Sequence, residues 1–536
     1  MVYHGEDRRM HVAKPWWMML LTLALWLMAT LDSPDVGWGQ PKYGGTLVMV
    51  HTDPDLMNPV ATPGWIQFQR MSFNGLIDYD AQGNIVPSIA TSWKISDDGL
   101  TYTFQLRQDV KWHDGQTLTA EDVKFTYEKI LDPQIASRFN LNFQAVKDIQ
   151  TPSPSTVVVT LKGPDPVFLA NLWAGIIPKH IWEKEDFAKS PYNISPVGSG
   201  PWKLKEWVRG DHMIFDANPD YFQGRPYLDR VIVKVIPDAT VAFAALEKGD
   251  VDYFPFTGVI GGPPYQLVNR LKQSPRLEVK VFDVVSTQRL FFRNDRPPFN
   301  NLKVRQAVAH AINKRFIVDK LLFGYGQITH SEVPSALPWA HNPEVPQYNY
   351  DVAKANQLLD EAGYPRGAGG IRFRTHIYGN PGVRAILSEI LKEQLKAVGI
   401  AADVVMNEWA SYINAIRNTR EIDGVFTIFS LQSVPDPSIE AIRYHSTQIK
   451  PGGQNYLFYS NPRVDAIIDE TQSTLDQQKR TQLFYEYQDI LAREVPMIPL
   501  YTLTGVDIWN KKFDGFGVTQ WGGGAITFLE KVWQKE

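Results

Sequence analysis

Val231-Ile-Val-Lys-Val-Ile236, followed by a helix-like segment from Ala239 to Lys248, is the stretch that decides the class of fold. The first run is apolar, mostly β-branched and of strand length. The second ends at Gly249-Asp250, where a glycine can close a helix. Extended structure resumes at Val251-Asp-Tyr-Phe254. Strands that alternate with helices in this way predict parallel β-α-β units.

The same alternation continues toward the C-terminus. Apolar residues on one stripe predict a helix over residues 302–323. Further strands and helices follow at the spacing of additional β-α-β units, so we expect an α/β fold. The expected strands are 372–378, 400–406 and 425–429, and the expected helices are 383–398 and 409–417.

The N-terminal part has a different character, because its short strands follow one another as hairpins do. Thr119 and Asp122 are spaced as a capping box for a helix that runs through Leu131. Asp80 to Asn84 reads as a hairpin turn, and Gly198-Ser-Gly-Pro201 as a turn that enters a strand. At least two architectures are therefore expected in this chain. The strands expected here are 46–50, 101–107 and 156–161.

Length and composition exclude several classes of protein. At roughly 150 residues per domain, 536 residues predict about three to four units. A net charge of −4, from 54 basic and 58 acidic residues, gives no electrostatic footprint for nucleic acid. The absence of cysteine excludes disulfides, thiolate metal sites and the lipidated cysteine of a lipoprotein.

Residues 1–39 are typical of a secretory signal peptide. A basic segment with Arg8, Arg9 and Lys14 precedes an apolar run that is shorter than a membrane-spanning helix. Cleavage after Gly39 would leave Gln40 first. We expect a periplasmic protein without a lipid anchor, with an uncleaved leader as the alternative.

No catalytic or metal-binding motif stands out. The chain lacks the G-x-S-x-G, H-E-x-x-H and G-x-x-x-x-G-K-[ST] patterns. Its 11 histidines include no pair at the spacing of helix ligands, and His113 is expected in a structural turn. We therefore expect no metal, no cofactor and no enzyme. Carboxylates that are distant in the sequence leave a secreted hydrolase as the alternative.

Two loops are expected at a ligand crevice. Open α/β sheets bind ligands beyond the carboxyl ends of their strands. One such loop runs from His51 to Asn58 and contains Asp53, and the other runs from Ser430 to Pro437. A tryptophan at a cleft offers a large flat contact with few rotors to restrict. Three tryptophans are candidates for that contact, with a core position as the alternative for each: Trp65, Trp409 and Trp521.

A series of short motifs supports a more specific interpretation. The strongest stretch runs from Gly75 to Tyr127 and includes Asp98-Gly-Leu-Thr-Tyr-Thr-Phe-Gln-Leu-Arg107 and Val110-Lys-Trp-His-Asp-Gly115. With the later matches it covers essentially the whole chain after the leader. The chain thereby resembles the family 5 extracellular solute-binding proteins of ABC importers, which include dipeptide-, oligopeptide- and nickel-binding members. The later matches are Gly198-Ser-Gly-Pro201, Ala245-Leu-Glu-Lys-Gly249, Val304-Arg-Gln-Ala307 and Tyr350-Asp351.

The resemblance implies a periplasmic binding protein-like fold with two main α/β lobes, a hinge and an inserted third lobe. Lobe I would take residues 41–78, 196–284 and 506–536, lobe II the insertion 79–195, and lobe III residues 285–505. A peptide-like or other small solute would be enclosed between lobes I and III. The implied partner is an ABC permease with its ATPase subunits. The receptor would be a monomer that meets the membrane only through the permease or an uncleaved leader.

The binding residues of the family transfer only in part. Glu408-Trp409 resembles a Glu-Trp motif whose Trp lines a side-chain pocket in oligopeptide-binding members. Where peptide-binding members carry an Asp for the ligand's α-ammonium, Ser433 stands four residues before Pro437. Asp436 could substitute from a shifted loop. We therefore expect modified peptides, opine-like compounds, saccharides or metal chelates before ordinary free-amine peptides. The candidate ligand-binding residues are His51, Asp53, Trp65, Trp409, Phe429, Ser430, Gln432, Ser433, Asp436 and Trp521.

N-terminal sequencing of the exported protein tests the leader. We expect Gln40 as the first residue, or the residue after Ala29 if the weaker cleavage position is used. Exported protein that retains Met1 would contradict removal of the leader.

Overall fold

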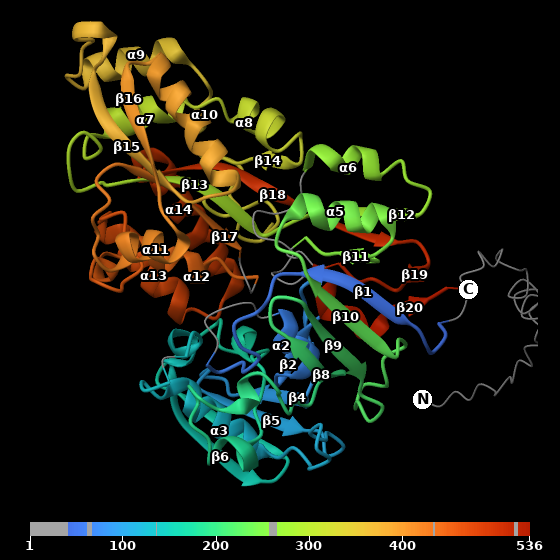
Figure 1. The fold of residues 1–536 in the computed structure, drawn as a ribbon. Coiled ribbons are helices and arrows are strands. Elements are labelled where there is room, and N and C mark those ends of the chain that lie inside the picture. The colour runs from blue at the N-terminus through green and yellow to red at the C-terminus, as the bar shows by residue number, and fades with distance from the viewer. Residues whose placement is uncertain are drawn as a thin grey trace, which may run out of the picture. The chain divides into compact units, whose positions relative to one another are not determined.

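One large mixed sheet organises the part of the chain that the computed structural model describes, namely residues 41–61, 67–135, 137–256, 265–431, 435–518 and 524–535 (Figure 1). Its strands follow one another in the order β16-β15-β17-β13-β18-β11-β1-β10-β9-β8, and β12 and β14 also pair with β18. The bounds of these strands are β1 (Thr46–His51), β8 (Trp202–Val208), β9 (His212–Ala217), β10 (Arg230–Val235), β11 (Tyr253–Phe254), β12 (Leu277–Asp283), β13 (Ser286–Phe292), β14 (Gly326–Ile328), β15 (Phe373–Gly379), β16 (Ile400–Met406), β17 (Val425–Leu431) and β18 (Met497–Asn510).

The stretch around Val231 forms the predicted parallel unit. β1 lies between β10 and β11 and runs parallel to both, and α5 (Ala239–Lys248) connects β10 to β11. The Asp238 side chain caps the start of α5 by accepting the Val241 N–H at 2.9 Å. Gly249 ends the helix in the left-handed region, at a φ of 94°. The β-α-β prediction is confirmed here.

The other half of the sheet repeats this unit but mixes strand directions. β15 runs parallel to β16 and β17, with α10 (Val383–Ala397) between β15 and β16, whereas β13 is antiparallel to β17 and β18. The helix predicted over 302–323 is wrong as a single element, because the chain forms α7 (Leu302–Ala311) and α8 (Lys314–Leu321). Asn313 separates the two helices, since its side chain accepts the Phe316 N–H at 2.8 Å and starts a new helix.

The remaining helices of the large sheet's two halves are mostly short. Within the described ranges, no helix combines the length and apolar character that a membrane crossing requires. The helices are α2 (Gln67–Ser72), α6 (Tyr265–Leu271), α9 (Val352–Glu361), α11 (Trp409–Arg417), α12 (Ser438–Ala441), α13 (Pro462–Ser473) and α14 (Gln477–Glu494).

Residues 79–195, the predicted insertion, supply a separate antiparallel sheet in the order β4-β5-β7-β6 and most of a separate hydrophobic core. The predicted capping box is present, with the Thr119 N–H donating to Asp122 Oδ2 at 2.8 Å. Asp80 Oδ1 accepts two backbone N–H groups in the expected hairpin turn. The same core also includes Val60, Phe73, Leu76 and Ile77, which precede residue 79. The elements are β2 (Ile77–Tyr79), β3 (Ile85–Pro87), β4 (Ala90–Ile95), β5 (Thr101–Leu106), α3 (Ala120–Leu131), β6 (Val146–Ser153), β7 (Thr156–Leu161) and α4 (Lys179–Trp182).

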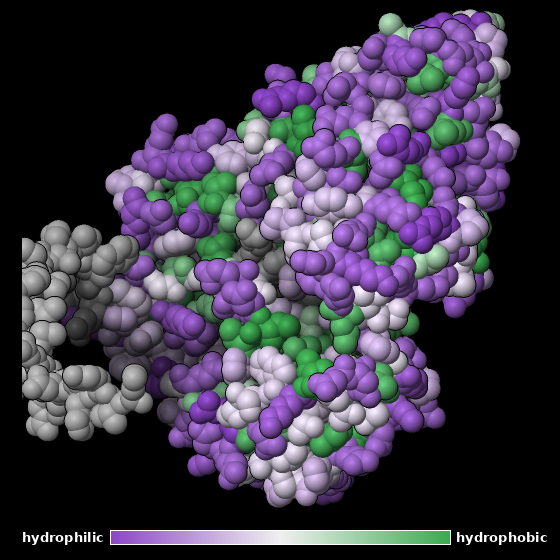
Figure 2. All heavy atoms as spheres, turned by 180° about the vertical axis from the view of Figure 1, so that it is seen from behind, coloured by the Kyte–Doolittle hydropathy of each residue, from purple (hydrophilic) through white to green (hydrophobic). Residues whose placement is uncertain are grey.

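Apolar side chains gather inside rather than on the surface. On the face shown in Figure 2, hydrophilic residues cover most of the surface and hydrophobic residues form small separate areas. One core cluster extends from Val50 and Phe243 through Tyr265 and Tyr325 to Ile498, so it includes residues from both halves of the large sheet. The two halves therefore share apolar contacts as well as strands.

The motif Gly198-Ser-Gly-Pro201 is a turn packed against the backbone of α2. The Gly200 N–H donates to the Ser72 carbonyl oxygen at 2.8 Å. A Cβ atom on Gly198 would lie 1.7 Å from the same oxygen, so a side chain cannot be accommodated without moving the backbone. His113 stabilises the turn, because its Nδ1 accepts a hydrogen bond from the Gly198 N–H at 3.3 Å. Burial lowers the pKa of His113 to about 4, which keeps the ring neutral and fits the predicted structural role.

The Gly198→Ala variant tests this packing. The added methyl group meets backbone rather than a flexible side chain, so we expect a loss of about 3 kcal/mol in the free energy of unfolding, measured by urea denaturation. Gly163→Ala is the matched control, because nothing lies within 4 Å of its added Cβ, and its effect should stay within about 0.5 kcal/mol. Equal stability of the two variants would contradict the role of Gly198.

Candidate functional site

An exposed tryptophan and a partly buried arginine lie together where α10 and α11 begin. Trp409, the first residue of α11, is 50% exposed. The guanidinium carbon of Arg384 lies 5.5 Å from the centre of the Trp409 ring. Tyr412 packs beside Trp409, with 6.3 Å between the ring centres. The arrangement offers a flat apolar surface next to a fixed positive charge.

Arg384 differs from an ordinary structural arginine in its partners. Its Nη1 donates to the side-chain oxygen of Asn380 at 2.9 Å. Among the described residues, no carboxylate forms an ion pair with Arg384, and its buried Nε makes no hydrogen bond. Burial lowers the pKa of Arg384 below its usual value. Because an unpaired buried charge is costly, this position favours an anionic group on a bound solute.

His51 and Asp53 lie where β1 ends, as predicted, but both have structural partners. The His51 ring is completely buried, with its centre 4.6 Å from that of Phe68, and burial lowers its pKa to about 4. The Asp53 carboxylate accepts the Trp207 indole N–H at 2.8 Å and the Gly210 N–H at 2.9 Å. These contacts fasten the loop after β1 to the β8–β9 hairpin.

Asp436 also has a partner within the protein. Arg480 donates to both of its carboxylate oxygens, at 2.8 and 2.9 Å, and the Ser438 N–H donates to it at 3.0 Å. Both side chains of the ion pair are nearly buried. In this conformation Asp436 fixes the start of α12 and does not present a free carboxylate to an ammonium group.

Several predicted ligand-binding residues cannot be placed in this way. For Phe429 and Ser430 the structure describes only the backbone, which pairs with Gln288 and Thr287 of β13. The remaining candidates lie outside the described residues: Trp65, Gln432, Ser433 and Trp521.

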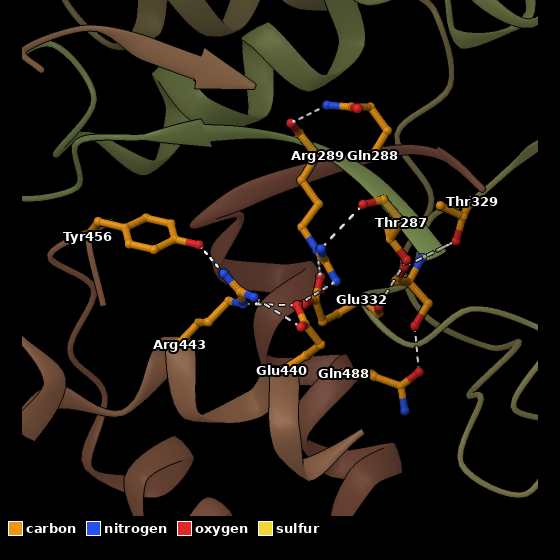
Figure 3. A network of polar contacts seen from close by, with 10 residues as sticks. Thr287, Gln288, Arg289, Thr329, Glu332, Glu440, Arg443, Tyr456 and Gln488 are labelled. Carbon is orange, nitrogen blue, oxygen red and sulfur yellow. Dashed lines mark hydrogen bonds and ion pairs between the residues drawn. The ribbon is translucent and has the colours of Figure 1, made fainter. Parts of the chain in front are cut away.

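A buried ionic network holds the segment that follows β17 (Figure 3). Arg289 on β13 donates to Glu332 at 2.6 Å, and its guanidinium also lies 3.6 Å from Glu440 of α12. Arg443 pairs with Glu440 at 2.9 Å and contacts the Tyr456 hydroxyl. Two arginines and two glutamates balance each other in charge.

The electrostatics of this Arg289–Arg443 network support its structural role. Burial opposes a charge on Arg289, but Glu332 and Glu440 more than offset it and raise the pKa of Arg289. Because Glu440 belongs to α12, the network fixes α12 against β13 and thereby the point at which the loop after β17 ends. The network pairs its charges within the protein and holds α12 in place.

Comparison with known proteins identifies the class to which this architecture belongs. The model for the bacterial extracellular solute-binding proteins, family 5 middle, matches residues 84–450. The chain belongs to the family 5 solute-binding proteins. The oligopeptide-binding protein AppA of Bacillus subtilis is 30% identical over 509 residues, which cover 90% of this chain and 92% of AppA.

Solved structures agree with this family. The structure of Bacillus subtilis AppA with a nonapeptide matches with a TM-score of 0.81 and 28% identity, covering 93% of this chain and all of that one. NikZ of Campylobacter jejuni with Ni(L-His) matches at 0.80 and 27%, covering 92% and 100%. AgaA of Agrobacterium tumefaciens R10 with agropinic acid matches at 0.77 and 25%, covering 92% and 99%.

The family identifies the function at a coarse level. A family 5 solute-binding protein captures a solute outside the cytoplasm and delivers it to an ABC permease, and it is not an enzyme. None of these comparisons supports the alternative of a secreted hydrolase. The predicted family, α/β fold and transport function are thus confirmed.

Arg384 is a candidate site residue that the sequence alone did not single out. A usable signal was present, because Arg384 stands just after the predicted strand 372–378, at the kind of strand end where α/β sheets bind ligands. Its lack of a carboxylate partner depends on distant residues and has no signature in the sequence. The same holds for the Arg480–Asp436 pair, whose members are 44 residues apart.

Arg289→Met tests the buried network. Removing one cation leaves Glu332 buried without its ion-pair partner, so we expect a loss of about 3–5 kcal/mol in the free energy of unfolding, measured by urea denaturation. The control is Arg463→Met, which breaks the exposed Arg463–Glu486 pair and should leave the free energy of unfolding nearly unchanged, because solvent screens an exposed pair. Similar losses in the two variants would contradict the importance of the network.

Proposed function

We propose that this family 5 protein is the receptor for a carboxylate-bearing solute, whose negative charge pairs with Arg384 and whose apolar or planar part packs on Trp409. The observation that carries the proposal is the partly buried Arg384, which has no carboxylate partner in the described part of the chain and lies beside the exposed indole of Trp409. A cation and an aromatic surface at one point recognise both a charge and a shape.

The ligands of the related structures support this chemistry. AppA was solved with a nonapeptide, NikZ with Ni(L-His) and AgaA with agropinic acid. A peptide, an amino acid and an opine-type acid all carry a carboxylate. A neutral saccharide would leave Arg384 without a counter-charge, so saccharides are the less favoured class here.

The amino end of the solute is the point at which we expect a difference from ordinary peptides. Ser433 stands where peptide-binding relatives are expected to carry an acid, and a hydroxyl cannot replace a buried ion pair. Asp436, the nearest acidic alternative in the sequence, is bound to Arg480. We infer that the solute is a modified peptide or an opine-like acid without a free α-ammonium.

Delivery would follow from closure of lobes I and III around the solute. A solute shifts this equilibrium only by the difference in its affinity for the closed and open states. We infer further that the leader exports the protein to the periplasm, where it acts as a monomer without a lipid anchor and hands the solute to a permease coupled to ATPase subunits.

The Arg384→Gln variant tests the carboxylate site by calorimetry on a panel of peptides, N-acetylated peptides, opines and saccharides. We expect the best solute to lose at least about 30-fold in affinity, because losing one partner of a buried charge pair costs about 2–5 kcal/mol. Arg315→Gln is the control, since the Arg315 side chain is 75% exposed on α8. Amidation of the solute carboxylate should weaken binding to the native protein similarly.

Two outcomes would contradict the proposal. Equal binding of a carboxylate and its amide would remove the role of Arg384. Tighter binding of free-amine peptides than of their N-acetylated forms would show that the inference from Ser433 is wrong.

A further inference from the structure

A tyrosine in the turn between α8 and β14 lies against the helix α6 on the other side of the proposed hinge. The rings of Tyr325 and Tyr265 are stacked, with 5.5 Å between centres and 11° between planes. The Tyr325 hydroxyl donates to Asn269 Oδ1 at 2.6 Å. Lys272 Nζ lies 5.0 Å from the Tyr325 ring centre. Tyr265 and Asn269 are four residues apart on α6 and Lys272 directly follows the helix, so this end of α6 presents one face to Tyr325.

These contacts join the two proposed main lobes. α6 lies between β11 and β12 in lobe I, whereas α8 and β14 belong to lobe III. The Tyr265 hydroxyl also donates to the Thr504 carbonyl oxygen at 2.7 Å, in the part of β18 that passes from one lobe to the other. Tyr325 therefore connects lobe III to a lobe I residue that is anchored at the crossing itself.

The backbone before Tyr325 supports the importance of this placement. Phe323 has a φ of 51° and Gly324 a φ of 83°. A non-glycine residue in the left-handed region is strained and persists only where the surroundings fix it. The Phe323 side chain is 48% exposed, so burial of its own ring does not compensate for this strain. The turn places the Tyr325 side chain in a buried position.

We propose that Tyr325 is an interlobe latch, which stabilises the arrangement of lobes I and III seen here and so tunes the affinity for solute without touching it. The inference rests on the proposed lobe closure but not on the identity of the solute. A rotation of lobe III that moves Tyr325 away from α6 would separate it from Asn269 and Tyr265 together. An interaction present in only one arrangement shifts the equilibrium between the two.

Spin-label distance measurements on the solute-free protein test the latch directly. The chain contains no cysteine, so Val241→Cys in lobe I and Tyr350→Cys in lobe III supply two exposed labelling positions without further changes. Tyr325→Phe removes only the hydroxyl. In Tyr325→Phe, we expect fewer molecules to show the distance between the two labels that this structure predicts. The ratio of these molecules to all others should fall by about threefold to tenfold, the usual effect of one hydrogen bond.

Asn269→Ala should produce the same shift, and the double variant should produce no further one, because both changes remove the same bond. Tyr348→Phe is the matched control. Its hydroxyl contacts Gln306 within lobe III, so it should leave the distance distribution unchanged. Thermal unfolding of each variant verifies that it is folded.

Solute affinity provides the second readout. Tyr325→Phe should change the affinity for every solute that binds in the same direction. The factor should match the change in the population of the arrangement that binds the solute. An unchanged distance distribution, or independent additive effects of Tyr325→Phe and Asn269→Ala, would overturn the latch. Since the distances are measured without solute, failure of the carboxylate proposal would leave this result intact and distinguishable.

Discussion

The backbone hydrogen bonds of β18 are the constraint on which the rest of this structure depends. Buried N–H and C=O groups must be paired, and β18 meets this requirement by pairing with four different strands. All four strands are antiparallel to it: β13 and β14 pair with its residues 497–503, and β11 and β12 pair with its residues 504–510. One strand thereby enters both halves of the sheet. Side chains of β18 also contact both halves. Asp507 accepts the Phe256 N–H at 2.6 Å in the proposed lobe I, and Tyr501 belongs to the core cluster that includes residues of the proposed lobe III.

The arginines of this protein differ in how far their charge is satisfied by partners within the described residues. Arg289 and Arg480 are paired with carboxylates, and Arg305 donates to three backbone carbonyl oxygens. Arg384 has one amide oxygen as its recorded acceptor and lies beside Trp409. The other three arginines have acceptors around their guanidinium groups, whereas Arg384 has acceptors for only part of its group. Relatives solved with a nonapeptide, Ni(L-His) and agropinic acid show that this framework accommodates different solutes.

Local structure was largely predictable. The helices at 239–248 and 409–417 and the strand at 400–406 have the expected bounds, because periodicity and capping residues act within a few positions. The prediction of one helix over 302–323 was wrong. The apolar stripe continues along the whole segment, but the helix ends before Asn313, whose side chain caps a second helix. The loops after β1 and β17 were predicted to line the ligand crevice because they follow the carboxyl ends of strands. That rule does not specify where each side chain in the loop points. Asp53 and Asp436 lie in those loops and bind Trp207 and Arg480.

The sequence by itself determined the family, the α/β class and the order of most strands and helices, since motifs, periodicity and caps are properties of neighbouring residues. Only the tertiary structure decided which charges are paired. Asp436 and Arg480 are 44 residues apart, and Arg289 and Glu332 are 43 apart, so their pairing depends on how the sheet brings distant segments together. For the same reason only the fold reveals Arg384 as the partly unsatisfied cation and Tyr325 as the contact between lobes.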